Sequence, residues 1–240
     1  MRYPLFLVVA LLTGVLAAAA SPGRTTVVQA KPVPMDYLTR GVSAVSPNGD
    51  LNVTVTGKKE PFQAWVTLNK PAQGWSIQVW PIERNVTVLW NPDGRSFALT
   101  DDRYANHSYV LVIGTRFHMN GPKLGVQRVD LTPVLQDAFA NRARRYYQKH
   151  YGKSDYDGSY SFYAKALRWV SDNDLLVAVS GITSLPLSPR HLGTAAGVKG
   201  WAYGYLLDVS HRRILRTLSK KAMRAEYGID VSKFAGGADR

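Results

Sequence analysis

The chain has 240 residues, a formal net charge of +13 and no cysteine. The absence of cysteine excludes disulfide cross-links, thiol nucleophiles and cysteine-ligated metal sites. A chain of this length can nevertheless bury an apolar core large enough to be stable without such links.

The first 20 residues have the order of segments that marks a secretory signal peptide. Arg2 supplies a positive start, residues 5–16 (LFLVVALLTGVL) form an apolar run, and Ala17 to Ala20 supply small residues. This order predicts cleavage near Ala20 and a periplasmic or secreted product. The alternative is an uncleaved membrane anchor, which needs about 20 apolar residues to cross a bilayer, and the run here is shorter.

Positive charge is concentrated in two clusters, at residues 142–153 and 212–224. Cleavage would remove Arg2 and lower the net charge from +13 by one, to +12. Basic surfaces attract polyanions. Because an exported protein does not meet nucleic acid, the clusters indicate an acidic cell-envelope polymer, an acidic protein or the membrane surface as the partner. Solvated helix faces are the alternative interpretation.

The first half of the chain has the pattern of an antiparallel β meander. Residues 21–40 are predicted to be an extended lead-in because Pro, Thr and Val are frequent there. Beyond them, short β-branched and aromatic runs alternate with Pro, Asn, Asp and Gly. Strands are expected at 51–56, 64–68, 75–80, 86–90, 97–99 and 109–113.

A helix is predicted near residues 131–151. Thr132 suits the N-cap, Pro133 fits the first helical position, and Leu135 and Phe139 recur with helical spacing. The chain is therefore expected to form a single β-rich domain over 41–230 with this helical insertion, followed by a flexible tail at 231–240. Further strands are expected at 166–169, 175–180, 201–209 and 214–218, with a helix-like stretch at 219–227.

Three segments repeat a tight turn that precedes a strand, at residues 45–50, 90–95 and 169–174. In the second, Pro92 presets φ and Gly94 accepts a positive φ. This segment, Trp90-Asn91-Pro92-Asp93-Gly94, resembles the W-S-P-D-G turn of TolB-type (WD40-like) β-propeller repeats, and residues 205–210 (YLLDVS) are similar to a later element of that repeat. The resemblance covers about a third of the chain beyond the signal peptide. It implies incomplete or degenerate β-propeller-like antiparallel sheets, with a β-sandwich as the alternative.

The motifs of common enzymes and metal sites are absent from the sequence, and no cofactor or metal is predicted. The candidate binding surface lies where the basic helix meets a run of tyrosines, because Tyr and Arg are the residues that favour protein interfaces. Its candidate residues are Arg142, Arg144, Arg145, Tyr146, Tyr147, Lys149, Tyr151, Tyr156 and Tyr160.

These features predict an exported, non-enzymatic binding or interaction protein of the cell envelope, of which an inhibitor or immunity-type protein is one form. Its partner is expected to be a protein or an acidic cell-envelope polymer. Two alternatives stay open. One is an envelope hydrolase whose site assembles only in the fold. The other is a binder of polyanions or the membrane surface that uses both basic clusters.

Overall fold

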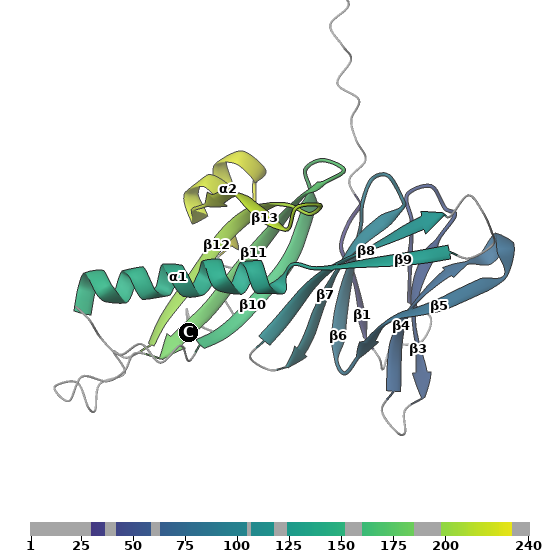
Figure 1. Ribbon diagram of the computed structural model, residues 1–240, viewed down its shortest axis with the longest axis horizontal. Coiled ribbons are helices and arrows are strands. Elements are labelled where there is room, and N and C mark those ends of the chain that lie inside the picture. The colour runs from purple at the N-terminus through teal and green to yellow at the C-terminus, as the bar shows by residue number, and fades with distance from the viewer. Residues whose placement is uncertain are drawn as a thin grey trace, which may run out of the picture.

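The computed structural model describes residues 30–36, 42–58, 63–104, 107–117, 124–151, 160–184 and 198–231. They form a mainly β structure with one nine-stranded sheet, one four-stranded sheet and two α-helices (Figure 1). Residues 1–20, on which the signal-peptide prediction rests, lie outside this range. Within it, no helix is long and apolar enough to cross a membrane.

The four-stranded sheet has the order β2-β3-β4-β5, with every pair antiparallel. Alternation of side chains explains its two faces: Val53 points into the core, whereas the neighbouring Thr54 lies on the opposite face. The expected strands at 51–56, 64–68 and 75–80 correspond to three of its members. Its elements are β2 (Ser43–Val45), β3 (Asn52–Lys58), β4 (Gln63–Lys70), the short 3₁₀ turn Pro71–Gln73 and β5 (Trp75–Ile82).

The nine-stranded sheet has the order β1-β6-β7-β8-β10-β11-β12-β13, and β9 pairs with β8. Its pairs are antiparallel except for one parallel bridge, at which His107 of β8 faces Phe162 of β10. The strands are β1 (Val33–Asp36), β6 (Asn85–Trp90), β7 (Ser96–Tyr104), β8 (His107–Phe117), β9 (Leu124–Asp130), β10 (Tyr160–Trp169), β11 (Asp174–Ser184), β12 (Val198–Asp208) and β13 (Arg213–Leu218).

Both predicted helical regions are helices. Helix α1 (Thr132–Tyr151) joins β9 to β10 and lies across β10 to β12 (Figure 1). Helix α1 begins at Thr132 itself, and the Thr132 hydroxyl accepts a hydrogen bond from the Val110 amide of β8 at 3.0 Å. Helix α2 (Lys220–Tyr227) is capped by Ser219, which accepts from the Ala222 amide, and ends at Gly228.

Three apolar clusters hold these elements together. The four-stranded sheet packs on one face of β6 to β8, where Val53 and Leu68 meet Val88 and Phe97. The other face of β6 to β8 shares a cluster with α1 and with β10 to β12. Helix α2 covers the opposite face of β11 and β12 through Met223. Val231, the first residue of the predicted tail, is buried in that third cluster.

The mainly β class and the helical insertion are confirmed, but no closed or propeller sheet is found among the described residues. The strands join instead into two open sheets. The bridge between His107 and Phe162 joins β8 to β10, and β1 adds to the edge of β6. The four-stranded sheet and β6 to β8 share one apolar cluster, and the β-sandwich alternative stays a prediction.

Candidate functional site

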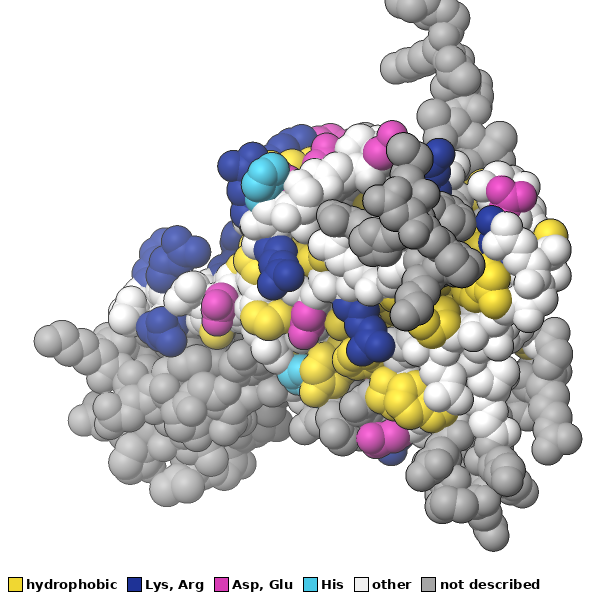
Figure 2. Space-filling view, turned by 45° about the vertical axis from the view of Figure 1, so that its right-hand side comes forward, with side chains coloured by type: hydrophobic (Ala, Val, Ile, Leu, Met, Phe, Trp, Pro, Cys, Tyr) yellow, Lys and Arg dark blue, Asp and Glu magenta, His cyan; other side chains and the backbone are white. Residues whose placement is uncertain are grey.

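The solvent face of α1 carries much of the predicted surface. Its exposed side chains recur with helical spacing opposite the buried Leu135, Phe139 and Ala143. Beyond Asp137 the helix contains no acidic residue. In Figure 2, Lys and Arg are most frequent over the left and upper parts of the molecule, the end that contains both α1 and α2 in Figure 1. We call these exposed residues the basic α1 face: Asn141, Arg144, Arg145, Gln148 and Lys149.

The tyrosine part of the predicted surface stays a prediction. The backbone of Tyr146, Tyr147 and Tyr151 lies in α1, and Tyr160 begins β10. The side chains of these four residues, and the whole of Tyr156, lie outside the described residues. The structure therefore brings together the basic residues of the candidate surface without testing its aromatic ones.

Arg142 differs from the other basic residues of α1 because it turns toward the sheet. It is half-buried, and its guanidinium carbon lies 3.9 Å from the centre of the Tyr203 ring. A cation over an aromatic face is attracted by the ring quadrupole. Tyr203 belongs to β12, which sequence reasoning treated only as a strand. The alternating pair Tyr203 and Tyr205 was the available signal that two aromatic rings share one face of that strand.

Tyr205 lies next to this contact and is 1% exposed. Burial raises the pKa of its phenol to about 12, although the positive charges of Arg142 and Arg145 oppose that shift. The hydroxyl therefore keeps its proton at neutral pH and is available as a hydrogen-bond donor.

The first half of α1 is held against β8 by His107. The Gln136 side-chain amide lies 2.9 Å from Nε2 of His107. Because an amide NH₂ only donates, Nε2 of the neutral ring accepts. Burial lowers the pKa of His107, which favours this neutral form. The His107 ring also packs against Tyr109 and Phe162, at 5.0 and 5.4 Å between centroids. This contact fixes the helix that carries the basic face.

Comparison with known proteins adds no constraint on this surface. No family model, curated protein or solved structure matches the chain. What bears on function is therefore the chemistry of the groups that the fold brings together.

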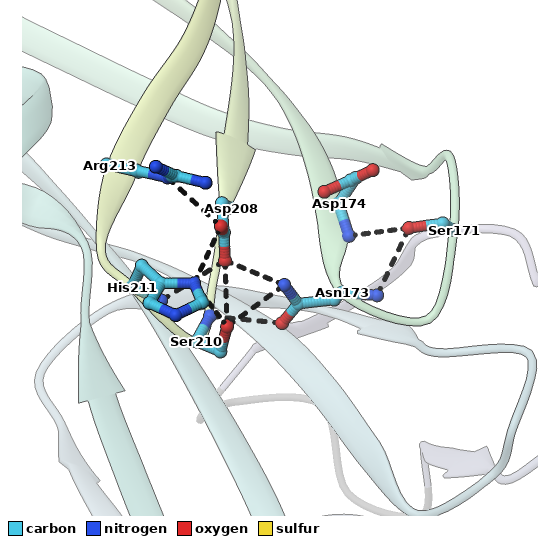
Figure 3. Close-up of polar contacts among 7 residues, drawn as sticks. All are labelled: Ser171, Asn173, Asp174, Asp208, Ser210, His211 and Arg213. Atoms are coloured by element: carbon cyan, nitrogen blue, oxygen red, sulfur yellow. Dashed lines mark hydrogen bonds and ion pairs between the residues drawn. The ribbon is translucent and has the colours of Figure 1, made fainter.

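A second polar cluster lies at the turn between β12 and β13 (Figure 3). The carboxylate of Asp208, whose side chain is 8% exposed, accepts hydrogen bonds from Asn173 at 2.7 Å and from Ser210 at 2.8 Å. His211 and Arg213 approach its other oxygen at 2.8 and 3.2 Å. Burial acts to raise the pKa of Asp208, but the hydrogen bonds from Ser210, His211 and Asn173 outweigh it and hold this pKa well below its usual range.

Ser210, His211 and Asp208 have the residue types of a hydrolase triad but not its geometry. The Ser210 hydroxyl and the Asp208 carboxylate both lie against Nδ1 of His211, at 3.0 and 2.8 Å. A triad needs the serine on Nε2, so that the ring takes the proton from one side while the acid orients the other. The cluster instead joins the β12–β13 turn to the β10–β11 turn through Asn173. No group of three or more metal-ligating side chains occurs within the described ranges.

We expect the free energy of unfolding of Asp208→Asn to depend less on pH in the acid range than that of the wild type. Because the pKa of Asp208 is lower in the folded chain than in the unfolded one, its contribution is complete above about pH 4. That contribution is lost as the pH falls toward the folded pKa. Urea midpoints at pH 7, 4, 3 and 2 should fall less steeply in the variant than in the wild type. Parallel curves for the two proteins would show that the cluster does not act through this carboxylate.

Proposed function

We propose that this chain is an exported, non-enzymatic binding protein that uses the basic α1 face to hold an acidic cell-envelope polymer. The observation that carries the proposal is a difference between the two basic clusters. Arg144, Arg145 and Lys149 form no ion pair with any described residue, and the hydrogen bonds that Arg144 and Arg145 form within the described part of the chain go to Asn141. Their charge is therefore available to an outside anion.

The second cluster is partly neutralised by its own fold. Arg216 donates two hydrogen bonds of 2.9 Å to the Glu226 carboxylate, and Arg213 contacts Asp208. A bidentate arginine–carboxylate pair satisfies the groups that would otherwise recognise an outside carboxylate. This difference favours α1 over β13 as the binding surface.

We also propose that the scaffold is a row of three degenerate propeller-like blades. Each would be a four-stranded antiparallel meander, the unit of a propeller blade: β2 to β5, β6 to β9, and β10 to β13. Under this proposal the joining of β8 to β10 and of β1 to β6 conceals the boundaries between blades.

Equivalent contacts between successive turns support this arrangement. The Trp90 indole donates to the Ala44 carbonyl at 2.9 Å, and the Trp169 indole donates to the Leu89 carbonyl at 3.1 Å. Ala44 and Leu89 occupy matching positions, three residues before the proline of their turns. The Asn91 amide then donates to the Asp172 carbonyl at 2.8 Å, which joins the second turn to the third.

The test compares two charge reversals of equal size. Arg144→Glu with Lys149→Glu changes the basic α1 face, and Lys220→Glu with Lys221→Glu changes α2, where both lysines are exposed. Binding to polygalacturonate is measured by calorimetry at low salt. We expect the α1 pair to weaken binding on the order of tenfold and the α2 pair to change it by about twofold or less.

Salt provides the second readout. Because exposed charges are screened over about 3 Å at 1 M salt and about 10 Å at 0.1 M, wild-type binding should disappear by about 0.5 M salt. If both charge reversals weaken polygalacturonate binding equally, binding depends on the net charge of the protein and not on the basic α1 face. If the chain binds an acidic protein but does not bind polygalacturonate, the proposal that its partner is an acidic polymer is wrong.

A further inference from the structure

The Tyr205 hydroxyl is a buried polar atom without a hydrogen-bond partner among the described residues. The residue is 1% exposed, and its oxygen forms no hydrogen bond within the described part of the chain. Buried hydroxyls are nearly always satisfied, because removing such a group from water without a replacement bond is costly. An orphaned donor at this position therefore requires an explanation.

Arg142 packs on the ring beside Tyr205, and Arg145 lies one turn further along α1. Arg142 lies over Tyr203, two residues from Tyr205 on the same face of β12. Arg145 follows Arg142 by three positions, so both side chains lie on neighbouring parts of the α1 surface. The charges of both arginines act on the Tyr205 phenol. The phenol and the two arginines therefore form one local group.

This group contains two cationic donors and a phenol, and it lacks a negatively charged acceptor among the described residues. Guanidinium groups only donate, and the Tyr205 phenol keeps its proton at neutral pH. Neither Arg142 nor Arg145 forms an ion pair with a described residue, and Arg145 donates only to the Asn141 carbonyl, at 3.3 Å. Arg142 is moreover half-buried, where an uncompensated charge is less well hydrated than at the surface. An acceptor-only group of negative charge complements all three donors.

We infer that Arg142, Arg145 and Tyr205 form a subsite for a single oxyanion group, a carboxylate or a phosphate, at the inner edge of the basic α1 face. The inference rests on the proposed function and names the chemical group that the polymer would present. The Tyr205 O–H would donate to one oxygen of the anion and the guanidinium groups to the others. The exposed Arg144 and Lys149 would then act on the neighbouring charges of the same polymer.

Small anions test this subsite in the full-length protein. Binding of inorganic phosphate and of glucuronate is measured by calorimetry at constant ionic strength, with chloride as the balancing ion. The two anions show which oxyanion the subsite prefers. We expect saturable binding of at least one of them, about fivefold weaker in Tyr205→Phe and at least about tenfold weaker in Arg142→Gln. Arg95→Gln, at an exposed turn position, serves as the control and should bind as the wild type does.

Tyr205→Phe removes one oxygen and retains the buried ring, so far-ultraviolet circular dichroism should match that of the wild type. The subsite is wrong if this variant binds anions as the wild type does, or if the wild type shows no saturable binding. In either case the Tyr205 hydroxyl forms its hydrogen bond with water. The proposed function fails separately, if polygalacturonate binding is indifferent to the Arg144→Glu and Lys149→Glu changes. If that pair of changes abolishes polygalacturonate binding but Tyr205→Phe leaves anion binding unchanged, the basic α1 face is still the binding surface and the subsite is wrong.

Discussion

Trp169→Ala should destabilise the protein by about 3–5 kcal/mol. Trp169 is 4% exposed, and its indole joins the end of β10 to the Leu89 carbonyl of β6 at 3.1 Å. Truncation removes the ring from the apolar cluster that α1 shares with β6 to β8 and β10 to β12, and leaves a cavity between two parts of the sheet. Trp169→Phe retains most of the ring and loses the donor, so we expect a smaller loss of about 1–3 kcal/mol. Urea unfolding followed by circular dichroism measures both variants.

Trp75→Phe is the matched control for this prediction. The Trp75 indole donates to Gln73, two residues away, in an exposed contact that joins no distant elements. A change of about 0.5 kcal/mol or less is expected there, as for surface substitutions in general. If Trp169→Phe costs no more than Trp75→Phe, the contact between β10 and β6 does not contribute to stability in the way its geometry indicates.

Gly181→Ala should be at least as damaging, with an expected loss of about 3 kcal/mol or more, the upper end of the range for overpacking. A Cβ added at Gly181 would lie 2.2 Å from the Ser161 carbonyl oxygen and 2.6 Å from the Phe139 ring. Neither neighbour can move without a large cost in free energy, because the first is backbone of the adjacent strand and the second is the buried Phe139 ring of α1. The substitution should therefore loosen α1 as well as the β10–β11 pair, and chemical denaturation of the variant gives its cost.

Alanine substitutions at two other strand glycines serve as comparisons for the stability cost of Gly181→Ala. A Cβ at Gly204 would meet the Met223 side chain, at 2.1 Å from its sulfur, but that flexible chain can move, so a loss of about 1 kcal/mol is expected. At Gly114 the nearest atom lies 3.8 Å away, an ordinary contact, and Gly114→Ala should be close to neutral. A cost for Gly181→Ala no larger than that for Gly114→Ala would contradict the close packing of β11 against Phe139.

Local patterns predicted most of the elements because each pattern is contained in a few neighbouring residues. The alternation in 51–56 and the helical spacing of Leu135 and Phe139 depend on no distant contact. The strands that were missed lack such a pattern. The sequence of β9, LGVQRVD, has a glycine at its second position and carries charge near its end, and β2 has only three residues. Both are strands because a neighbouring strand completes their hydrogen bonds.

The candidate site was predictable only in its local part. The basic residues of α1 follow one another along the chain, so the exposed face could be found from the sequence. The contact between Arg142 and Tyr203 joins residues 61 positions apart, and no local pattern indicates that α1 lies across β12. The same limit applies to Asp208 and Asn173, which meet only because two turns lie side by side.

The turn resemblance predicted local structure, and it carried no information on how the strands join into sheets. Gly49 and Gly94 both adopt positive φ in equivalent tight turns, as the Pro-Asn-Gly and Pro-Asp-Gly sequences predict. Those turns also lie together, since a Cβ at Gly94 would be 2.8 Å from the Asn48 side chain. The way in which strands merge into sheets depends on long-range pairs such as His107 with Phe162, which turn sequences do not encode.

The most direct measurement of the central claim is a residue-resolved NMR titration with polygalacturonate at low salt. If the basic α1 face holds the polymer, the largest amide shifts should fall within residues 141–149, with smaller ones at Tyr203 and Tyr205 on β12. Shifts concentrated at residues 212–224, with none in α1, would contradict the account and assign the polymer to the other basic cluster.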